Sequence, residues 1–368
     1  MATITDLEAG AASLAITWGD GVVTTYPWLW LRDHAHDEHS LHPVTMQRQL
    51  HTAAIDPAIT ALEAGVVGDA VSITWAGESR PSVLPVAFLA RFRTPVAAAA
   101  RVDAARELWD ATSLPVAAST PWADIMDTEH GLHAWLQQVA TYGFAIASGT
   151  PNTVEATEAL LRRVGYVRET IFGGMWSFTA DLKKADTAYT NLELLPHTDG
   201  TYSHDAPGLQ LLHCLGFVGE GGESTMVDGF RVAAELRERA PEAYRLLSTV
   251  AVPGQYIGDG SHLIAARPVL RHDADGRLVQ VSYNTADRAP FLLGADEMVA
   301  FYDALRRFDE LTNDRSLQWR HVLAPGEAML FDNWRVLHGR TAYTGERTMC
   351  GGYVNHEDFE SLSLIHIS

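Results

Sequence analysis

Residues 328–340 read AMLFDNWRVLHGR, and this stretch gives the clearest indication of how the C-terminal part of the chain folds. The residues before Asp332 and those from Val336 onward are mostly apolar, as in buried strands, and the polar residues between them favour a tight turn. The stretch therefore predicts two strands joined by a turn, with His338 on the second strand. A histidine in this place projects from a rigid sheet, where it can hold a ligand.

Further strands and helices are predicted around this pair. Short apolar runs bounded by Gly, Pro and Asp turns occur at residues 209–214, 224–227 and 279–283, and helical periodicity occurs at residues 232–249 and 296–312. Short strands with such turns favour an antiparallel sandwich or barrel flanked by helices.

The beginning of the chain predicts a small, separate β-rich domain. Residues 13–18, 22–31 and 71–75 are rich in β-branched and aromatic side chains, and a short helical run follows at residues 86–93. An Ala-rich stretch then joins this part to the rest. We expect this first domain to span residues 1–95.

The second domain is expected to span residues 115–360 and to begin with helices. Residues 128–141 have helical spacing, and residues 143–147 predict a strand. Asn152 and Glu155 resemble a capping box that opens the next helix.

The composition indicates a globular protein in reducing surroundings. Of the 368 residues, 47% are hydrophobic and 20% charged, which excludes collagen-like and disordered classes. Cys214 and Cys350 are too few for a disulfide framework, so we expect a cytoplasmic protein. The net charge of −19 disfavours nucleic acid and anionic membranes as partners. It favours a cationic substrate, although it can equally serve solubility alone.

His197-Thr198-Asp199 predicts one side of a metal site. Residues two apart on an extended segment project to the same face, so the imidazole and the carboxylate can hold one ion. His338 can supply a third ligand across the sheet. A ferrous ion that binds a bidentate co-substrate and O₂ leaves three positions for the protein, which explains a face of two histidines and one carboxylate.

Two other histidine patterns in the chain can also offer metal ligands. His356-Glu357-Asp358 repeats the spacing, but only His366 follows it as a possible third ligand. His36 lies in the polar segment 32–39, which predicts either a solvated loop or a separate histidine-rich metal site.

An arginine is expected to hold the far carboxylate of a dicarboxylate co-substrate, because a guanidinium binds carboxylates bidentately. Arg347, which follows His338 closely, is the first candidate. Arg340 shares the face of His338 by strand alternation and remains a rival.

Several stretches of the chain resemble the γ-butyrobetaine and trimethyllysine dioxygenases, which are Fe(II)- and 2-oxoglutarate-dependent hydroxylases of carnitine synthesis in the TauD/TfdA-like superfamily. The stretches are residues 197–199, 211–215, 221–224, 227–230 and 331–340, together with residues 28–34 in the small N-terminal β-domain. The resemblance implies a double-stranded β-helix, or jelly-roll, core that binds iron through His197, Asp199 and His338. It also implies 2-oxoglutarate and O₂ as co-substrates, ascorbate as a reductant, a quaternary-ammonium amino acid or betaine as substrate, and a homodimer.

The resemblance further assigns residues to the co-substrate and the substrate. Arg347 would bind 2-oxoglutarate, with the hydroxyl of Ser224 donating to the same carboxylate. A quaternary ammonium has no hydrogen-bond donor and is held by aromatic faces through cation–π attraction. The residues at the family positions of this aromatic cage are Phe172, Trp176, Tyr189 and Tyr353.

The other end of the substrate decides between the two activities. Asp186 would accept the α-ammonium that trimethyllysine has and γ-butyrobetaine lacks, and Asn284 would bind the substrate carboxylate. Asp186 can instead merely cap a turn before Tyr189. We therefore expect a trimethyllysine 3-hydroxylase, with γ-butyrobetaine hydroxylase as the alternative. A jelly-roll binding protein or zinc hydrolase that uses the same three ligands is a third hypothesis.

Two stretches depart from the family pattern. Residues 34–39 contain no cysteine where the butyrobetaine enzymes can carry a zinc site, so we expect no structural zinc. Residues 361–368 do not continue the family pattern, and we assign them no function.

Overall fold

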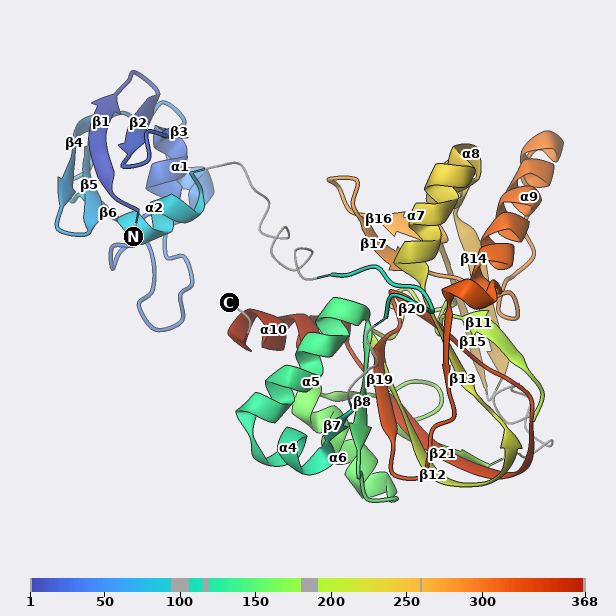
Figure 1. Ribbon diagram of the computed structural model, residues 1–368. Coiled ribbons are helices and arrows are strands. Elements are labelled where there is room, and N and C mark those ends of the chain that lie inside the picture. Colours follow the sequence, from blue (N-terminus) through green and yellow to red (C-terminus); the bar gives the residue numbers. More distant parts are fainter. Residues whose placement is uncertain (1, 94–105, 115–118, 180–190, 259, 367–368) are drawn as a thin grey trace. The chain divides into compact units, whose positions relative to one another are not determined.

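The computed structural model describes all residues except 1, 94–105, 115–118, 180–190, 259 and 367–368 (Figure 1). The chain divides into two units, Met1–Ala100 and Arg101–Ser368. The limits of the two domains that the sequence suggested, 1–95 and 115–360, stay predictions. Among the described residues, no helix is both long and apolar enough to cross a lipid bilayer.

The first unit consists of two three-stranded antiparallel sheets and short helices. The strands are β1 (Ile4–Ala9), β2 (Ser13–Trp18) and β3 (Val23–Pro27) in one sheet, and β4 (Ala61–Val67), β5 (Ala70–Trp75) and β6 (Ser82–Pro85) in the other. A 3₁₀ helix spans Thr52–Ala54, and the helices α1 (Trp28–Asp33) and α2 (Val86–Arg91) directly follow β3 and β6. Alternate residues of β2 and β5, such as Leu14 and Ile73, are fully buried in its core.

The strand predicted over residues 22–31 is wrong beyond Pro27. The helix α1 begins there, because the fixed φ of Pro27 suits a helix start and Trp28 and Leu31, three residues apart, face the core together. The aromatic residues that suggested a strand thus pack equally well on one face of a helix.

The second unit contains two sheets that share one apolar core. The larger sheet has the order β10 (Met175–Thr179), β21 (Tyr343–Val354), β12 (Leu209–Gly221), β19 (Ala328–Asp332), β8 (Phe144–Ser148) and β7 (Thr120–Pro121), with β9 (Val167–Arg168) paired to β21. The smaller sheet has the order β11 (Leu194–His197), β20 (Val336–Arg340), β13 (Ser224–Asp228) and β18 (Gln318–His321). Phe331 and Met349 from the larger sheet meet Met226 and Val336 from the smaller one. This arrangement confirms the expected mainly β jelly roll with a β-rich unit before it.

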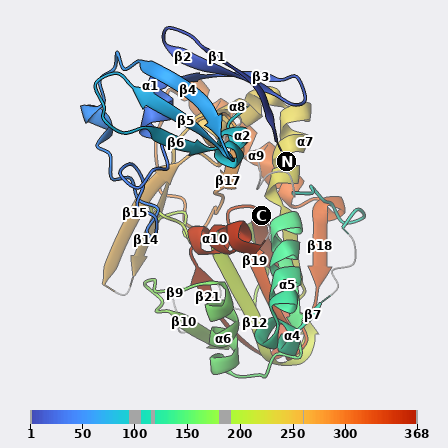
Figure 2. The same ribbon diagram turned by 90° about the vertical axis from the view of Figure 1, so that its left-hand side faces the viewer.

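Helices cover the outside of this core in two groups. Figures 1 and 2 show α4 (Trp122–Asp127), α5 (Glu129–Tyr142) and α6 (Val154–Val164) together beside the larger sheet, and α10 (His356–His366) packs against the same apolar cluster through Phe359. The second group is α7 (Gly229–Arg239), α8 (Pro241–Thr249) and α9 (Ala295–Thr312). Two hairpins accompany it: β14 (Val252–Gly258) with β15 (Ser261–Arg267), and β16 (Leu270–His272) with β17 (Leu278–Val281). Arg315–Leu317 form a further 3₁₀ helix before β18.

Two helix boundaries differ from the sequence-based expectation. The helix predicted over residues 232–249 is two helices, because Pro241 disfavours helical geometry at Ala240, whose φ and ψ are −149° and 70°. The cap of α6 is Thr153, whose side chain accepts a hydrogen bond from the backbone of Ala156, and not Asn152.

Candidate metal centre and substrate cavity

Two of the predicted metal ligands are cross-strand neighbours. His197 ends β11 and lies directly opposite His338 of β20 in the antiparallel register, and their ring centroids are 4.4 Å apart. Gly339 permits this pairing, because a Cβ at that position would lie 2.6 Å from the carbonyl oxygen of Leu194. The strand pair therefore places both imidazoles on one side of the smaller sheet.

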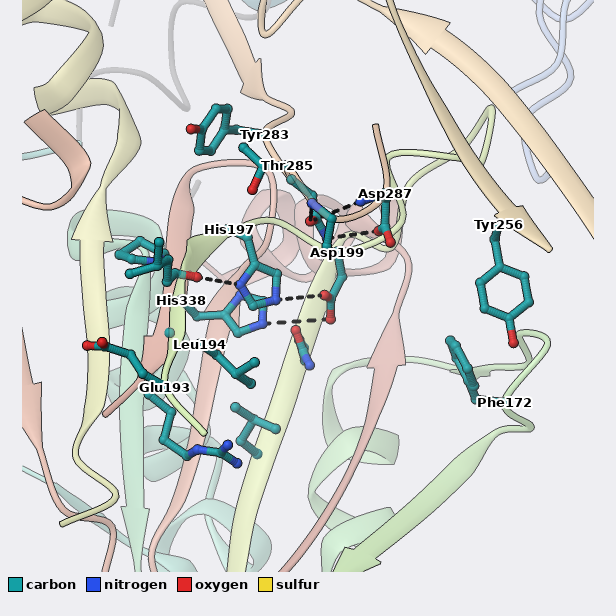
Figure 3. A pocket seen from close by; sticks show the side chains of 18 of the residues that line it. Phe172, Glu193, Leu194, His197, Asp199, Tyr256, Tyr283, Thr285, Asp287 and His338 are labelled. Carbon is teal, nitrogen blue, oxygen red and sulfur yellow. Dashed lines mark hydrogen bonds and ion pairs between the residues drawn. The ribbon is translucent and has the colours of Figure 1, made fainter. Parts of the chain in front are cut away.

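Asp199 completes the group from the segment that follows β11 (Figure 3). Its Oδ1 is 3.5 Å from Nε2 of His197, and its Oδ2 is 3.8 Å from Nε2 of His338. In the part of the chain that the structure describes, these three residues form the one group of metal-ligand side chains whose ligand atoms all lie within 4.8 Å of one another.

Asn333, in the turn between β19 and β20, fixes the backbone around Asp199. Its Oδ1 accepts a hydrogen bond from the Asp199 backbone N–H at 2.8 Å, and its Nδ2 donates to the carbonyl oxygens of Asp199 and Pro207 at 3.1 and 2.9 Å. On the other side, the Thr198 N–H donates to the Tyr283 carbonyl at 2.8 Å. Sequence analysis missed Asn333, although a polar residue directly after a buried strand is a recognisable signal.

The protonation of the three side chains suits a divalent cation. Nδ1 of His197 is 2.8 Å from the Leu195 carbonyl, to which it donates, so that Nε2 faces Asp199. Burial lowers the pKa of His197, but the hydrogen bond and charge of Asp199 outweigh this effect, so the pKa is raised overall. A positive charge beside the Asp199 carboxylate is therefore favoured. Burial and the neighbouring His197 lower the pKa of His338 to about 3, so this ring is neutral and offers a lone pair.

Asp199 remains ionised despite its burial. Burial raises its pKa, but His338 and His197, both protonated at the low pH where this carboxyl titrates, and the hydroxyl of Tyr353 together lower it well below its usual range. Two imidazole nitrogens and one carboxylate are the donor set of non-haem ferrous sites with open positions, so the residues present fit an Fe(II) ion.

Tyr353 contacts one of the three metal-ligand side chains directly. Its hydroxyl donates to Oδ2 of Asp199 at 2.9 Å, and its ring centroid lies 5.8 Å from that of Trp176. The sequence suggested only an aromatic cage position for Tyr353. The structure shows that the same side chain also touches the carboxylate of the metal group.

A cavity of about 560 Å³ adjoins the three ligands and is rich in aromatic side chains. Phe172, Trp176 and Tyr353, three of the four predicted cage residues, line it. Sequence analysis missed Tyr256 and Tyr202, which also line it; Tyr256 lies 5.7 Å edge-on from Phe172 and 5.4 Å from Tyr202 between ring centroids. Tyr256 comes from the β14 hairpin, which carries no recognisable pattern of its own.

The predicted carboxylate-binding residue Asn284 also lines the cavity, but its amide has partners within its own turn. Nδ2 donates to Oδ2 of Asp287 at 2.8 Å, and Oδ1 accepts from the backbone of Ala286 at 2.9 Å. The role of Asn284 in binding the substrate stays a prediction. Asp287, three residues further on, is a cavity residue that sequence analysis did not single out.

Both candidate arginines line the cavity, but their surroundings differ. Nη2 of Arg340 donates to the carbonyl of Leu192 at 2.7 Å. Arg347 is 6% exposed, and within the described residues its guanidinium makes no hydrogen bond or ion pair; it lies 5.9 Å from the ring centroid of Tyr343. Ser224, opposite Arg340 in the β13–β20 register, lines the same cavity. A buried guanidinium without a hydrogen bond or ion pair, in a cavity that a hydroxyl also lines, fits an anionic ligand.

The remaining predicted residues have other surroundings. Asp186 and Tyr189 lie outside the described residues. His356 stacks on Trp334 with ring centroids 4.5 Å apart, and His36 packs on Phe88 with centroids 4.3 Å apart. Neither of these two histidines belongs to a group of three metal-ligand side chains in the described part of the chain.

Comparison with known protein families gives two matches. Residues 110–353 match the model of the taurine catabolism dioxygenase TauD, TfdA family. Residues 5–89 match the gamma-butyrobetaine hydroxylase-like N-terminal model.

Curated relatives align over nearly the whole chain. Trimethyllysine dioxygenase of Meyerozyma guilliermondii is 33% identical and covers 96% of this chain and 94% of its own. The mitochondrial trimethyllysine dioxygenase of Homo sapiens is 35% identical over 91% of this chain and 81% of its own. Gamma-butyrobetaine dioxygenase of Pseudomonas sp. strain AK-1 is 32% identical, with coverages of 96% and 94%.

Solved structures share the fold at low sequence identity. An asparagine oxygenase in complex with Fe(II), 3-hydroxyasparagine and succinate has a TM-score of 0.50 at 15% identity, over 62% of this chain and 80% of its own. A putative alpha-ketoglutarate-dependent taurine dioxygenase from Burkholderia xenovorans also has a TM-score of 0.50, at 14% identity. The match covers 68% of this chain and 93% of the Burkholderia chain.

Proposed function

The chain belongs to the TauD/TfdA family of dioxygenases, in the group of the trimethyllysine and γ-butyrobetaine dioxygenases, and we propose that it hydroxylates trimethyllysine at C3. One observation carries the proposal: two cross-strand histidines and an ionised aspartate meet beside a cavity that has aromatic rings and carboxylates on its walls. Such a site can hold iron and a cationic substrate at the same time.

His197, Asp199 and His338 would hold the Fe(II) ion, each through one atom. When bound, iron and 2-oxoglutarate supply the oxidising power: O₂ provides the oxygen atom inserted into an unactivated C–H bond, while 2-oxoglutarate loses CO₂ and becomes succinate. Arg347, a buried guanidinium with no hydrogen bond or ion pair among the described residues, would bind the far carboxylate of 2-oxoglutarate, and Ser224 would donate its hydroxyl to it. Arg340 is the less favoured candidate, because it already binds the Leu192 carbonyl.

The aromatic wall would bind the trimethylammonium group. Phe172, Trp176 and Tyr353 present ring faces or edges to the cavity, and Tyr189 is proposed with them from the family position. Cation–π attraction suits a cation that cannot donate hydrogen bonds. The excess of acidic over basic residues in the chain raises the local concentration of such a substrate.

γ-Butyrobetaine hydroxylation is the second candidate, because the Pseudomonas enzyme of that name is nearly as similar as the trimethyllysine enzymes. The two activities share the metal site and differ in whether the substrate carries an α-ammonium group. Asp186 and Asn284 remain proposed binding groups for that end of the substrate.

Side-by-side assays of the purified protein decide between the two. With Fe(II), 2-oxoglutarate and ascorbate, we expect trimethyllysine to gain the mass of one oxygen atom and succinate to form in equal amount. Mass spectrometry of the products with trimethyllysine and with γ-butyrobetaine measures both activities. Turnover of γ-butyrobetaine alone would replace the first proposal by the second.

We also propose that the protein acts in carnitine synthesis, as a homodimer, in the cytoplasm. The two cysteines of the chain are unpaired and buried, which suits a reducing compartment. Sedimentation analysis gives the mass of the assembly, and the mass of a single chain would refute the homodimer. Fractionation of cells that express the natural gene gives the compartment. Recovery of the protein in an organelle fraction would refute the cytoplasmic location.

A further inference from the structure

Asp287 is a carboxylate that reaches the substrate cavity from the loop after β17 (Figure 3). Two backbone hydrogen bonds to β14 fix this loop: Gln255 N–H donates to the Asp287 carbonyl at 2.7 Å, and Ala289 N–H donates to the Pro253 carbonyl at 2.8 Å. Oδ2 of Asp287 accepts from the amide of Asn284 at 2.8 Å. The carboxylate is therefore oriented before a ligand arrives, which lowers the entropy cost of binding.

The same carboxylate lies close to the metal group. In the view of Figure 3, Asp287 lies beside Asp199, between the metal ligands and the pair of Phe172 and Tyr256. The segment that leads to Asp287 is also fixed beside the metal ligands, because the N–H of Thr198, between His197 and Asp199, donates to the carbonyl of Tyr283 at 2.8 Å. Figure 3 shows Phe172 and Tyr256 beyond Asp287 as seen from His338, whereas Tyr353 of the aromatic wall stays in contact with Asp199.

The chemistry of trimethyllysine places its two cationic ends at different distances from the oxidised carbon. C3 is bonded directly to the α-carbon, which carries the α-ammonium group, whereas the trimethylammonium group is several bonds further along the side chain. When C3 faces the metal, the α-ammonium must therefore lie beside the metal ligands. The position of Asp287 meets this requirement.

We infer that Asp287 binds the α-ammonium group of the substrate, which has N–H donors for the proposed Asp186 as well, and thereby selects a trimethylated amino acid over a betaine that lacks this group. The inference rests on the proposed function, since it names the binding group for one end of that substrate. An ammonium that loses its charged partner in a partly buried site is bound much more weakly. A substrate without the α-ammonium group loses no binding energy when the charge of Asp287 is removed.

The test compares Asp287→Asn with the wild type on two substrates. The substrates are trimethyllysine and 6-(trimethylammonio)hexanoate, which is the same molecule without the α-amino group. The asparagine keeps the size of the side chain and an acceptor for Asn284. We expect kcat/KM for trimethyllysine to fall about 10- to 100-fold, and kcat/KM for the desamino compound to stay within about twofold of the wild type.

Two controls accompany these measurements. Asp296→Asn removes one negative charge from the exposed first turn of α9 and should leave both substrates unaffected. Titration with Mn(II) measures metal affinity separately: because the three metal ligands are unchanged, Asp287→Asn should weaken Mn(II) binding only through the lost nearby charge, by less than about fivefold and less than kcat/KM for trimethyllysine falls.

Each remaining outcome decides the question. An equal loss on both substrates would show that Asp287 acts through the metal site, and no loss on either would show that it does not touch the ammonium. Both results overturn the inference while wild-type turnover of trimethyllysine leaves the proposed function standing. If the wild type itself does not convert trimethyllysine, the proposed function fails and the inference fails with it.

Discussion

Tyr353 belongs to two parts of the site at once. Its ring lies beside Trp176 in the aromatic wall, and its hydroxyl donates to Oδ2 of Asp199 at 2.9 Å. A hydrogen bond to a ligating carboxylate fixes the orientation of that ligand, and such partners commonly change metal affinity about 10- to 100-fold. Tyr353 therefore contributes both to the proposed binding of the substrate cation and to the orientation of a metal ligand.

Replacement of Tyr353 by phenylalanine separates the two roles. Because the ring stays, KM for trimethyllysine should change less than about threefold, whereas the affinity for Fe(II) should fall about 10-fold through the lost hydrogen bond. Anaerobic calorimetric titration with Fe(II) measures the second effect. An unchanged metal affinity together with a raised KM would mean that Tyr353 serves only the aromatic wall.

Arg347 and Arg340 offer a second comparison of single residues. Arg347→Lys should raise KM for 2-oxoglutarate about 10- to 100-fold, because an ammonium cannot form the bidentate contact, and Arg340→Lys should have a smaller effect. Succinate formation at varied 2-oxoglutarate concentrations provides both constants. If Arg340→Lys has the larger effect, the assignment of the two arginines must be exchanged.

The metal residues could be predicted from sequence because their geometry is local. The two-residue spacing of His197 and Asp199 and the strand pattern around His338 imply their directions, and the register then brings them together. Asp287 and Tyr256 could not be predicted in this way, because their places depend on how segments from distant parts of the chain pack. The spacing of residues within one segment does not encode such contacts.

At the level of elements, His356 joins the start of α10 to the turn between β19 and β20. Its ring is stacked on Trp334 at an interplanar angle of 9°, and its Nε2 is 3.5 Å from Asp332. Nδ1 lies 3.3 Å from Glu360, one turn further along the helix. The second His-x-Asp pattern of the sequence thus has a structural explanation that needs no metal.

The stability of the second unit should depend on the charge of His356. Burial lowers its pKa, but Asp332 and Glu360 outweigh this and raise it to about 9, above the value near 6.5 of an unfolded chain. A raised pKa stabilises the fold fully below about pH 6.5, and this contribution disappears as the pH rises through about 9. We expect a loss on the order of 2 kcal/mol in the free energy of unfolding between pH 6 and pH 10.

Urea unfolding of the wild type and of His356→Gln at these two pH values measures this contribution. The variant should have a lower free energy of unfolding than the wild type at pH 6. Its free energy of unfolding should also fall less than that of the wild type between pH 6 and pH 10. An identical pH dependence of the two proteins would show that the charge on His356 does not stabilise α10.

Most elements were predictable where a pattern is repeated within one segment. The helices α5 and α9 and the strands β2, β5 and β8 follow their periodicity. The errors at residues 28–31 and 240 have a common cause. In both places a proline fixes the local backbone conformation. The apolar pattern alone does not show whether a strand or helix continues past the proline, ends there, or is followed by an element of another type.

At the level of the whole molecule, the net charge of −19 should assist the cationic substrate. Long-range attraction is screened by salt, so kcat/KM for trimethyllysine should fall several-fold between about 20 and 500 mM KCl, with kcat nearly constant. KM for the dianionic 2-oxoglutarate should not rise in parallel. A salt-independent kcat/KM for trimethyllysine would show that the charge serves solubility and not substrate capture.

An anaerobic titration with Fe(II) and 2-oxoglutarate, followed by visible absorption, tests the assignment of the metal site. We predict a metal-to-ligand charge-transfer band that saturates at one iron and one 2-oxoglutarate per chain and is absent from Asp199→Ala. A wild-type protein that binds both components without this band, or an Asp199→Ala variant with an undiminished band, would contradict the assignment of the site.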